Sequence, residues 1–186
     1  MDKTYNDLKR AQDEVSASSA GGAPFLIAYG LTFIITGILA FYLPRETSAL
    51  IAMFQGGAAL PLAFWLESRM GTTRMSNENP LKSLSAQMAM SQGLAIPFLI
   101  VVYNIDPGQI PVVMAGLGGV HFLPYAWLHR TNIYAILGFV VAFGAFALVW
   151  VLKSAAYAYI LLFVGVVYLI AAPLVYRHAK NIVDRA

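Results

Sequence analysis

The stretch that decides the fold reads Gly116-Leu-Gly-Gly-Val-His-Phe-Leu-Pro-Tyr-Ala-Trp-Leu-His-Arg130. It is mostly apolar, and His121 lies deep inside it. Glycines precede this histidine, and Pro124 follows it three residues later. A polar side chain at depth is costly in lipid, so an intramembrane histidine is by default a candidate for function. The stretch therefore predicts a membrane-spanning helix and supplies a first candidate residue.

The composition indicates lipid as the solvent of most of the chain. Of its 186 residues, 59% are hydrophobic and 11% are charged, whereas a soluble domain is about 25% charged. The absence of cysteine excludes disulfides, thiolate metal sites and cysteine nucleophiles. The polar first twenty residues lead into no short apolar core with a cleavage site, so no signal peptide is expected.

Six apolar segments follow, each near the ~20 residues needed to cross a bilayer. They cover residues 24–43, 48–66, 83–103, 110–128, 133–152 and 155–176. Lipid cannot satisfy open backbone groups, so the segments predict an all-α, polytopic integral membrane protein with six transmembrane helices. The expected division is a cytoplasmic surface helix and flexible linker over residues 1–22, a transmembrane domain over 23–177 and a cytoplasmic tail over 178–186.

The connections between these segments differ in their content of Lys and Arg. The two termini and the second and fourth loops carry ten of the twelve, and the alternate loops hold only Arg45 and Lys153. Because loops rich in Lys and Arg stay in the cytoplasm, both termini are expected to be cytoplasmic. The expected location is the cytoplasmic (inner) membrane of a bacterium.

The second, fourth and sixth segments end alike. A single offset superposes Gly56-Gly57 on Gly118-Gly119 and Trp65-Leu66 on Trp127-Leu128. This pattern favours three tandem helical hairpins over an inverted repeat. The alternative to a repeat is that the three ends became similar independently, since small and interfacial aromatic residues are common in such helices. Interior prolines also free backbone carbonyls and predict kinks; they are Pro61, Pro97, Pro124 and Pro173.

Several polar residues are expected at one depth, about 12 Å from the cytoplasmic end of their segments at 1.5 Å per residue. Gln55 lies about one turn deeper. Tyr125 shares a helix face with His121, and Gln87 belongs to a polar stripe on the third segment, beside Gln92. They predict a polar, proline-kinked cavity that opens toward the cytoplasm. The expected ligand-binding or lining residues are His121, Gln92, Gln87, Tyr125, Gln55, Tyr168 and Thr32.

Other readings of these residues remain open. Gln, Ser, Thr and His side chains often only bond across helices, at about 0.6 kcal/mol per bond. A metal needs three or four ligands, and one imidazole lies at depth, so no metal and no cofactor is expected. No carboxylate lies within the segments, and Ser91 with His121 is the one conceivable catalytic pair. No catalytic residue is assigned, and an enzyme is not expected.

Small residues on the fourth and fifth segments predict close helix packing. Ala115 and Gly119 lie one turn apart on the fourth segment. The fifth segment has Gly138, Ala142 and Gly144 among its phenylalanines and valines. Small residues let backbones approach closely in a membrane, so packing is the expected role of these glycines, ahead of contact with a ligand.

The fourth segment resembles a family of small uncharacterised bacterial six-helix membrane proteins. Its signature is close to Gly-Ala-His-Phe-Leu-Pro-Tyr-x-Trp-Leu, followed by a Tyr-x-Ile-Leu helix. The matching residues here are Gly119, His121, Phe122, Leu123, Pro124, Tyr125, Trp127, Leu128, Tyr134, Ile136 and Leu137. Val120 replaces the usual small residue, and the similarity extends over about residues 25–170. The resemblance implies the fold and brings no established activity.

The sequence leads to two functional hypotheses of different classes. The first is the binding or transport of a small solute through the polar cavity around His121. The second is a non-catalytic structural or regulatory membrane subunit that acts through helix–helix or partner contacts. The expected partners are the lipid bilayer and a small-molecule ligand, with no nucleic acid. Six short segments make a small bundle, which is compatible with a homodimer.

Overall fold

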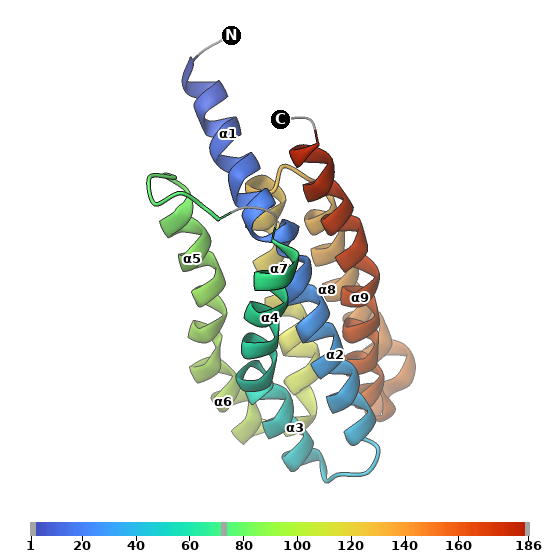
Figure 1. Cartoon of the computed structure of the whole chain (residues 1–186). Helices are drawn as coiled ribbons and strands as arrows, with labels where there is room; N and C mark the ends of the chain where they lie inside the picture. Colours follow the sequence, from blue (N-terminus) through green and yellow to red (C-terminus); the bar gives the residue numbers. More distant parts are fainter. Residues whose placement is uncertain (1–2, 72–73, 185–186) are drawn as a thin grey trace.

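The structure, a computed structural model, describes residues 3–71 and 74–184, and this part of the chain contains helices and their connections without strands. Helix α1 (Lys3–Ser18) lies at the end of the bundle that holds both termini (Figure 1). Long helical segments run from there to the opposite end and back. The predicted all-helical fold is confirmed.

Six long segments build the bundle. They are α2 (Ala23–Leu39); α3 (Arg45–Phe54) with α4 (Gly56–Met70); α5 (Lys82–Ser91), the turn η2 (Gln92–Ala95) and α6 (Ile96–Ile105); α7 (Ile110–Leu128); α8 (Ile133–Leu152); and α9 (Ala156–Val183). Turns η1 (Ala20–Gly22), η3 (Pro107–Gln109) and η4 (Lys153–Ala155) join some of them. Each segment begins within three residues of its predicted start, whereas α9 continues to Val183, seven residues beyond the predicted end of the sixth segment at 176.

Five helical stretches in the described residues are long and apolar enough to cross a membrane. The last of them, Ile133–Val183, has 51 residues. It folds back at Lys153, whose φ of 52° breaks the helix, and so contains both α8 and α9. Length and composition thus make the fold compatible with a multi-pass membrane protein.

One of the four interior prolines coincides with a break near the middle of its segment. The second segment is also interrupted, at Gln55, but Pro61 lies six residues further on, inside α4. The third passes through η2 directly before Pro97, which occupies the first turn of α6. Helices α7 and α9 continue through Pro124 and Pro173. Proline removes the backbone bond to the residue four positions earlier. For Pro97 that residue is Gly93, inside η2, whereas for Pro61 it is Gly57, beyond the break at Gln55, so only the break at η2 follows from a proline.

Reciprocal glycine contacts hold the two closest helix pairs together. A Cβ atom at Gly119 on α7 would lie 2.7 Å from the Gly138 oxygen on α8, and one at Gly138 would lie 2.5 Å from the Gly119 oxygen. Gly30 on α2 and Gly165 on α9 meet in the same way, at 3.1 and 2.7 Å. Both contacts exclude any larger residue, which confirms the predicted packing role of Gly119 and Gly138.

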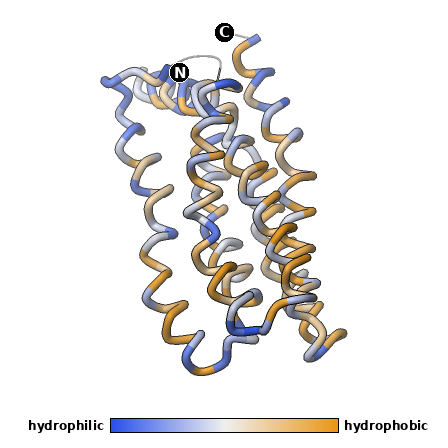
Figure 2. The backbone as a smooth tube through the Cα atoms, turned by 60° about the horizontal axis from the view of Figure 1, so that its bottom comes forward, coloured by the Kyte–Doolittle hydropathy of each residue, from blue (hydrophilic) through white to orange (hydrophobic). Residues whose placement is uncertain are grey.

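The third segment packs far less closely than the others. Leu99 is the one buried residue of α5, η2 and α6, and the segment lies at one edge of the bundle (Figures 1 and 2). Figure 2 also shows that its α5 half is more polar than its α6 half. The helices with the most extensive contacts, α2 with α9 and α7 with α8, come from different predicted hairpins. The hairpin repeat therefore stays a prediction.

The joint between α1 and α2 is closely packed. Ala20, Gly21 and Gly22 all have positive φ, of 51°, 66° and 81°. The Tyr134 hydroxyl donates to the Gly21 carbonyl oxygen, and a Cβ atom at Gly21 would lie 2.6 Å from the Val175 oxygen. The small residues expected to form a flexible linker therefore allow a tight turn against α8 and α9.

A matched pair of substitutions tests the glycine contact between α7 and α8. Gly119→Ala is expected to lower the free energy of unfolding by about 1–3 kcal/mol, the usual cost of overpacking. Gly116→Ala is the control, because a Cβ atom there meets nothing within 4 Å. Thermal unfolding in mild detergent measures both variants. Equal stability of the two would contradict the contact.

Candidate functional site

His121 connects the fourth segment to the loosely packed third one. Its ring is half-buried on α7, and its Nδ1 atom lies 3.2 Å from Ser91 Oγ at the end of α5. The ring of Tyr125, one turn further along α7, meets the imidazole edge-on with 5.0 Å between centroids. This contact joins two helices inside their apolar lengths.

The hydrogen-bond pattern assigns the proton on this imidazole. The Ser91 hydroxyl has a single proton and donates it to the Met88 carbonyl oxygen at 2.7 Å. The contact with His121 is then a bond in which Nδ1–H donates to Ser91 Oγ. In this neutral tautomer Nε2 is an acceptor, and no described residue donates a hydrogen bond to it.

The Ser91–His121 pair does not have the arrangement of a nucleophile and its base. A serine nucleophile donates its hydroxyl proton to the imidazole, and a third group orients the base from the other side. Here Ser91 donates to a backbone carbonyl of its own helix. No described carboxylate bonds to the ring of His121.

The two tyrosines of the predicted site lie in different environments. Tyr125 contacts His121 directly. Tyr168, on α9, is buried among aromatic rings and meets Phe122 edge-on at 5.4 Å and Phe33 at 5.7 Å. The structure therefore brings Tyr125 to His121, whereas Tyr168 packs with Phe122.

Three other predicted residues make no bond to another segment. Thr32 Oγ1 donates to the Tyr29 carbonyl oxygen at 3.0 Å, within α2. Gln87 Nε2 donates to Ser83 Oγ at 3.1 Å, within α5. Gln92 begins η2, directly after Ser91. Gln92 is thus near the His121 contact in the chain, and the other two bond within their own helices.

Gln55 is the most unusual of the predicted residues. Its side chain is 7% exposed, and neither its amide nitrogen nor its amide oxygen has a partner among the described residues. It lies at the break between α3 and α4. A buried polar group without a partner costs about 1–3 kcal/mol, so this amide marks a polar position that water or a ligand would satisfy.

The two best-formed hollows lie at the ends of the bundle. One, of about 100 Å³, is lined by residues of α1, α4 and α9 such as Ala17, Met70 and Lys180. The other, of about 80 Å³, includes Arg45 and Lys153 at the opposite end. None of the seven predicted site residues lines either hollow. The central cavity remains a prediction.

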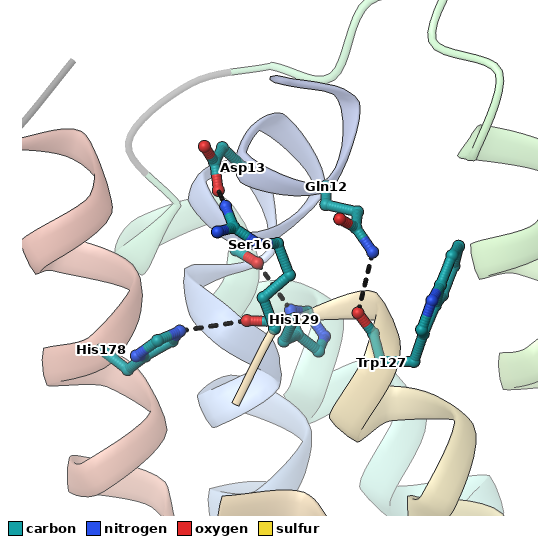
Figure 3. Close-up of polar contacts among 7 residues, drawn as sticks. Gln12, Asp13, Ser16, Trp127, His129 and His178 are labelled. Atoms are coloured by element: carbon teal, nitrogen blue, oxygen red, sulfur yellow. Dashed lines mark hydrogen bonds and ion pairs between the residues drawn. The ribbon is translucent and has the colours of Figure 1, made fainter. Parts of the chain in front are cut away.

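A polar cluster that the sequence did not reveal joins α1 to the end of α7 (Figure 3). Gln12 Nε2 donates to the Trp127 carbonyl oxygen at 2.9 Å, and Ser16 Oγ lies 3.0 Å from His129 Nδ1. His178 Nε2, on α9, donates to the His129 carbonyl oxygen at 3.0 Å. Gln12 and Ser16 are buried, so these bonds form inside a packed contact.

Charged residues of α1 extend this contact. Asp13 forms an ion pair of 2.8 Å with Arg130, although both side chains are about one third exposed and such a pair contributes little on its own. Glu14 accepts a bond from Asn79 Nδ2 at 2.7 Å, and the same amide donates to the Ala11 carbonyl oxygen at 3.1 Å. Helix α1 is therefore fixed to the loop before α5 as well as to α7.

His129 is neutral at the centre of this cluster. Burial of the imidazole lowers the pKa of His129 to about 4, and the nearby charge of His178 acts in the same direction. The rings of Tyr125 and Tyr134 stack on it at 5.9 and 5.3 Å. A neutral ring has one donor and one acceptor nitrogen, which suits the bond to Ser16.

The sequence contained a weak signal for this cluster. Gln12 and Ser16 lie one turn apart and beside Ala11 and Val15, the two buried members of an apolar stripe on α1 that also includes Tyr5 and Leu8. Polar residues at the edge of an apolar stripe indicate a helix packed on protein. Their partners lie more than 100 residues away, and no local pattern identifies them.

The fold defines an all-helical chain with several stretches able to cross a membrane. Residues 8–178 match a family of unknown function, DUF7010, and the chain belongs to this family. No curated protein and no solved structure matches it. The prediction that the chain belongs to an uncharacterised family is thus confirmed.

The bond between Ser16 and His129 is open to a direct test. Ser16→Ala leaves the buried His129 nitrogen without its partner. The free energy of unfolding is therefore expected to fall by about 1–3 kcal/mol. Ser18→Ala is the control, since Ser18 donates only to the Val15 carbonyl oxygen, which Ser19 also satisfies. Hydrogen exchange of α1 reports the result. Unchanged exchange in Ser16→Ala would contradict the docking of α1.

Proposed function

We propose that this chain is a protein of the bacterial cytoplasmic membrane with six spans, both termini inside and three tandem hairpins. The length and hydropathy of the helical segments support the spans. The concentration of Lys and Arg at the end that holds both termini supports the orientation. These assignments place His121 within the hydrocarbon region and His129 at its cytoplasmic edge.

We further propose that the protein binds, and passes, a small polar solute at the face of α7 that carries His121. The contact between His121 and Ser91 carries this proposal. It is a polar contact between α7 and a segment that buries almost nothing. A helix held by so little packing can move away from α7 at small cost and uncover the imidazole.

The third segment has a point at which it can bend. The turn η2 interrupts the α-helix before Pro97, and a Cβ atom at Gly93 would meet nothing within 4 Å. Small residues without close neighbours absorb changes of backbone angle readily. Bending at η2 would move α5, with Ser91 and Gln87, relative to His121 and Tyr125.

The free acceptor on His121 defines the chemistry of the solute. With Nδ1–H donated to Ser91, Nε2 is available to a donor such as a hydroxyl, amine or amide. The Tyr125 ring beside the imidazole offers an apolar surface to the rest of the molecule. In a medium of low dielectric such a bond is stronger than in water. Gln92, at the start of η2, is positioned to contribute next to Ser91.

A structural or regulatory subunit is the second candidate. The local bonds of Thr32 and Gln87, and the position of both hollows away from His121, favour it. Under this alternative the polar residues only stabilise helices. The two candidates differ in whether a small molecule depends on His121.

Native mass spectrometry of the gently solubilised full chain separates the two candidates. The wild type is expected to retain a small molecule that His121→Leu and Ser91→Ala lose while staying folded. Ser85→Ala is the matched control, because Ser85 lies on the same helix and makes no bond to His121.

Retention of the same molecule by His121→Leu would overturn the assignment of the site. Loss of thermal stability in His121→Leu, with no bound molecule in any sample and a second protein in the wild-type preparation, would favour the structural subunit.

A further inference from the structure

A hollow of about 80 Å³ lies at the end of the bundle opposite the two termini. Residues from three connections line it: the start of α3, the turn η3 before α7 and the turn η4 between α8 and α9. Figure 1 shows these connections together at that end. At about 30 Å³ of liquid volume per water molecule, the hollow has room for a small polyatomic ion.

Two cations from distant parts of the sequence converge on this hollow. Arg45 and Lys153 both line it, and they are the two basic residues that the sequence assigns to this end of the bundle. Arg45 Nη2 donates to the Ser154 carbonyl oxygen at 3.3 Å. Lys153 Nζ lies 5.1 Å from the centre of the Trp150 ring. Both side chains are exposed, so these backbone and ring contacts orient the two cations without fixing them.

Neither cation makes a direct ion pair among the described residues. Asp106 also lines the hollow, and its pKa is lowered by bonds that its carboxylate accepts from Gln109 Nε2 at 3.0 Å and the Gly108 N–H at 2.8 Å, and further by the charge of Arg45. Glu46, in the first turn of α3, is exposed and does not line the hollow. The hollow thus presents two positive charges and one carboxylate that is already bonded.

A buried hydroxyl group adds an unused donor. Tyr157 lines the hollow and is 8% exposed, and the nearest hydrogen-bonding group to its hydroxyl is the fully buried Ser48 hydroxyl. The two hydroxyls lie close enough to interact, and neither makes a hydrogen bond of good geometry to any other described residue. Arg45 lies over the same tyrosine, 5.8 Å from the ring centre. Two hydroxyls that bond only to each other leave one O–H donor unused, and an unused donor at this depth is costly and marks a place for a polar ligand.

We propose that this hollow binds a small oxyanion, a carboxylate or phosphate group, through Arg45, Lys153 and the Tyr157 hydroxyl. A guanidinium group matches the two oxygens of such an anion, and the ammonium group adds a point charge. The tyrosine supplies a neutral donor from within the bundle. A dissolved anion and the phosphate of a lipid headgroup have the same recognised chemistry, and the hollow accommodates a group of either origin.

Fluorescence of Trp150 reports binding, because an anion that draws Lys153 toward itself changes the environment of the indole. The full chain carries Trp65→Phe and Trp127→Phe, which leaves Trp150 as the single indole of the three. The protein is placed in nanodiscs of phosphatidylcholine and titrated with inorganic phosphate at constant ionic strength. A second arm replaces the titration with nanodiscs that contain phosphatidylglycerol.

The proposal predicts a saturable change in emission. Arg45→Gln and Lys153→Gln are each expected to weaken binding about tenfold or more, as the loss of a charge-assisted bond does. Tyr157→Phe, which keeps both charges, is expected to weaken it several-fold. Arg69→Gln is the matched control, because Arg69 lies in the last turn of α4, away from the residues that line this hollow. Thermal unfolding confirms that each variant is folded.

Each result decides the proposal. A phosphate titration that saturates and is weakened in Arg45→Gln establishes a site for a dissolved anion. A response confined to phosphatidylglycerol, and lost in Arg45→Gln, establishes the lipid phosphate as the source. Emission unchanged in both arms, or a response that Arg45→Gln and Lys153→Gln leave intact, overturns the proposal.

Discussion

The rest of the structure depends on the close backbone contact at two reciprocal glycine pairs. Gly30 meets Gly165 between α2 and α9, and Gly119 meets Gly138 between α7 and α8. In a bilayer no hydrophobic force drives helices together, so close packing must supply the attraction. Because α8 also packs on α9, the two pairs join into one unit of four helices. The third segment has no such contact and lies outside this unit.

The separation of the third segment from the four-helix unit explains where the polar side chains contact one another. His121 lies on a face of α7 that the glycine contact leaves open, and the loosely packed α5 covers it through Ser91. Near the C-terminal end of the same helix, α1 fixes the Trp127 and His129 positions by buried bonds. One helix therefore has a firmly held end and, two turns away, a polar side chain beside a weakly held neighbour. Such a combination suits a site that must keep its shape while access to it changes.

Much of the fold could be predicted because its causes are local. The length and hydropathy of each segment set the helices, and Pro97 indicated the break at η2. Depth along a helix placed Thr32, Tyr168 and His121 at one level, but it did not say which way each side chain faces. Thr32 bonds its own backbone and Tyr168 packs on Phe122, so a common expected depth does not by itself bring side chains together. The contacts of α1 with the end of α7, and the convergence of Arg45 and Lys153 on one hollow, bring together residues over 100 positions apart, beyond any local pattern.

The central claim is that four helices form a rigid unit and the third segment moves beside it. The chain has no cysteine, so pairs of spin labels can be introduced at exposed positions and their distances measured by double electron–electron resonance in nanodiscs. Labels at Ala86 and Phe139 report the distance between α5 and α8, and labels at Ile35 and Phe139 report the distance between α2 and α8. The account predicts a broad distance distribution for the first pair and a narrow one for the second. Equally narrow distributions for both pairs would contradict it.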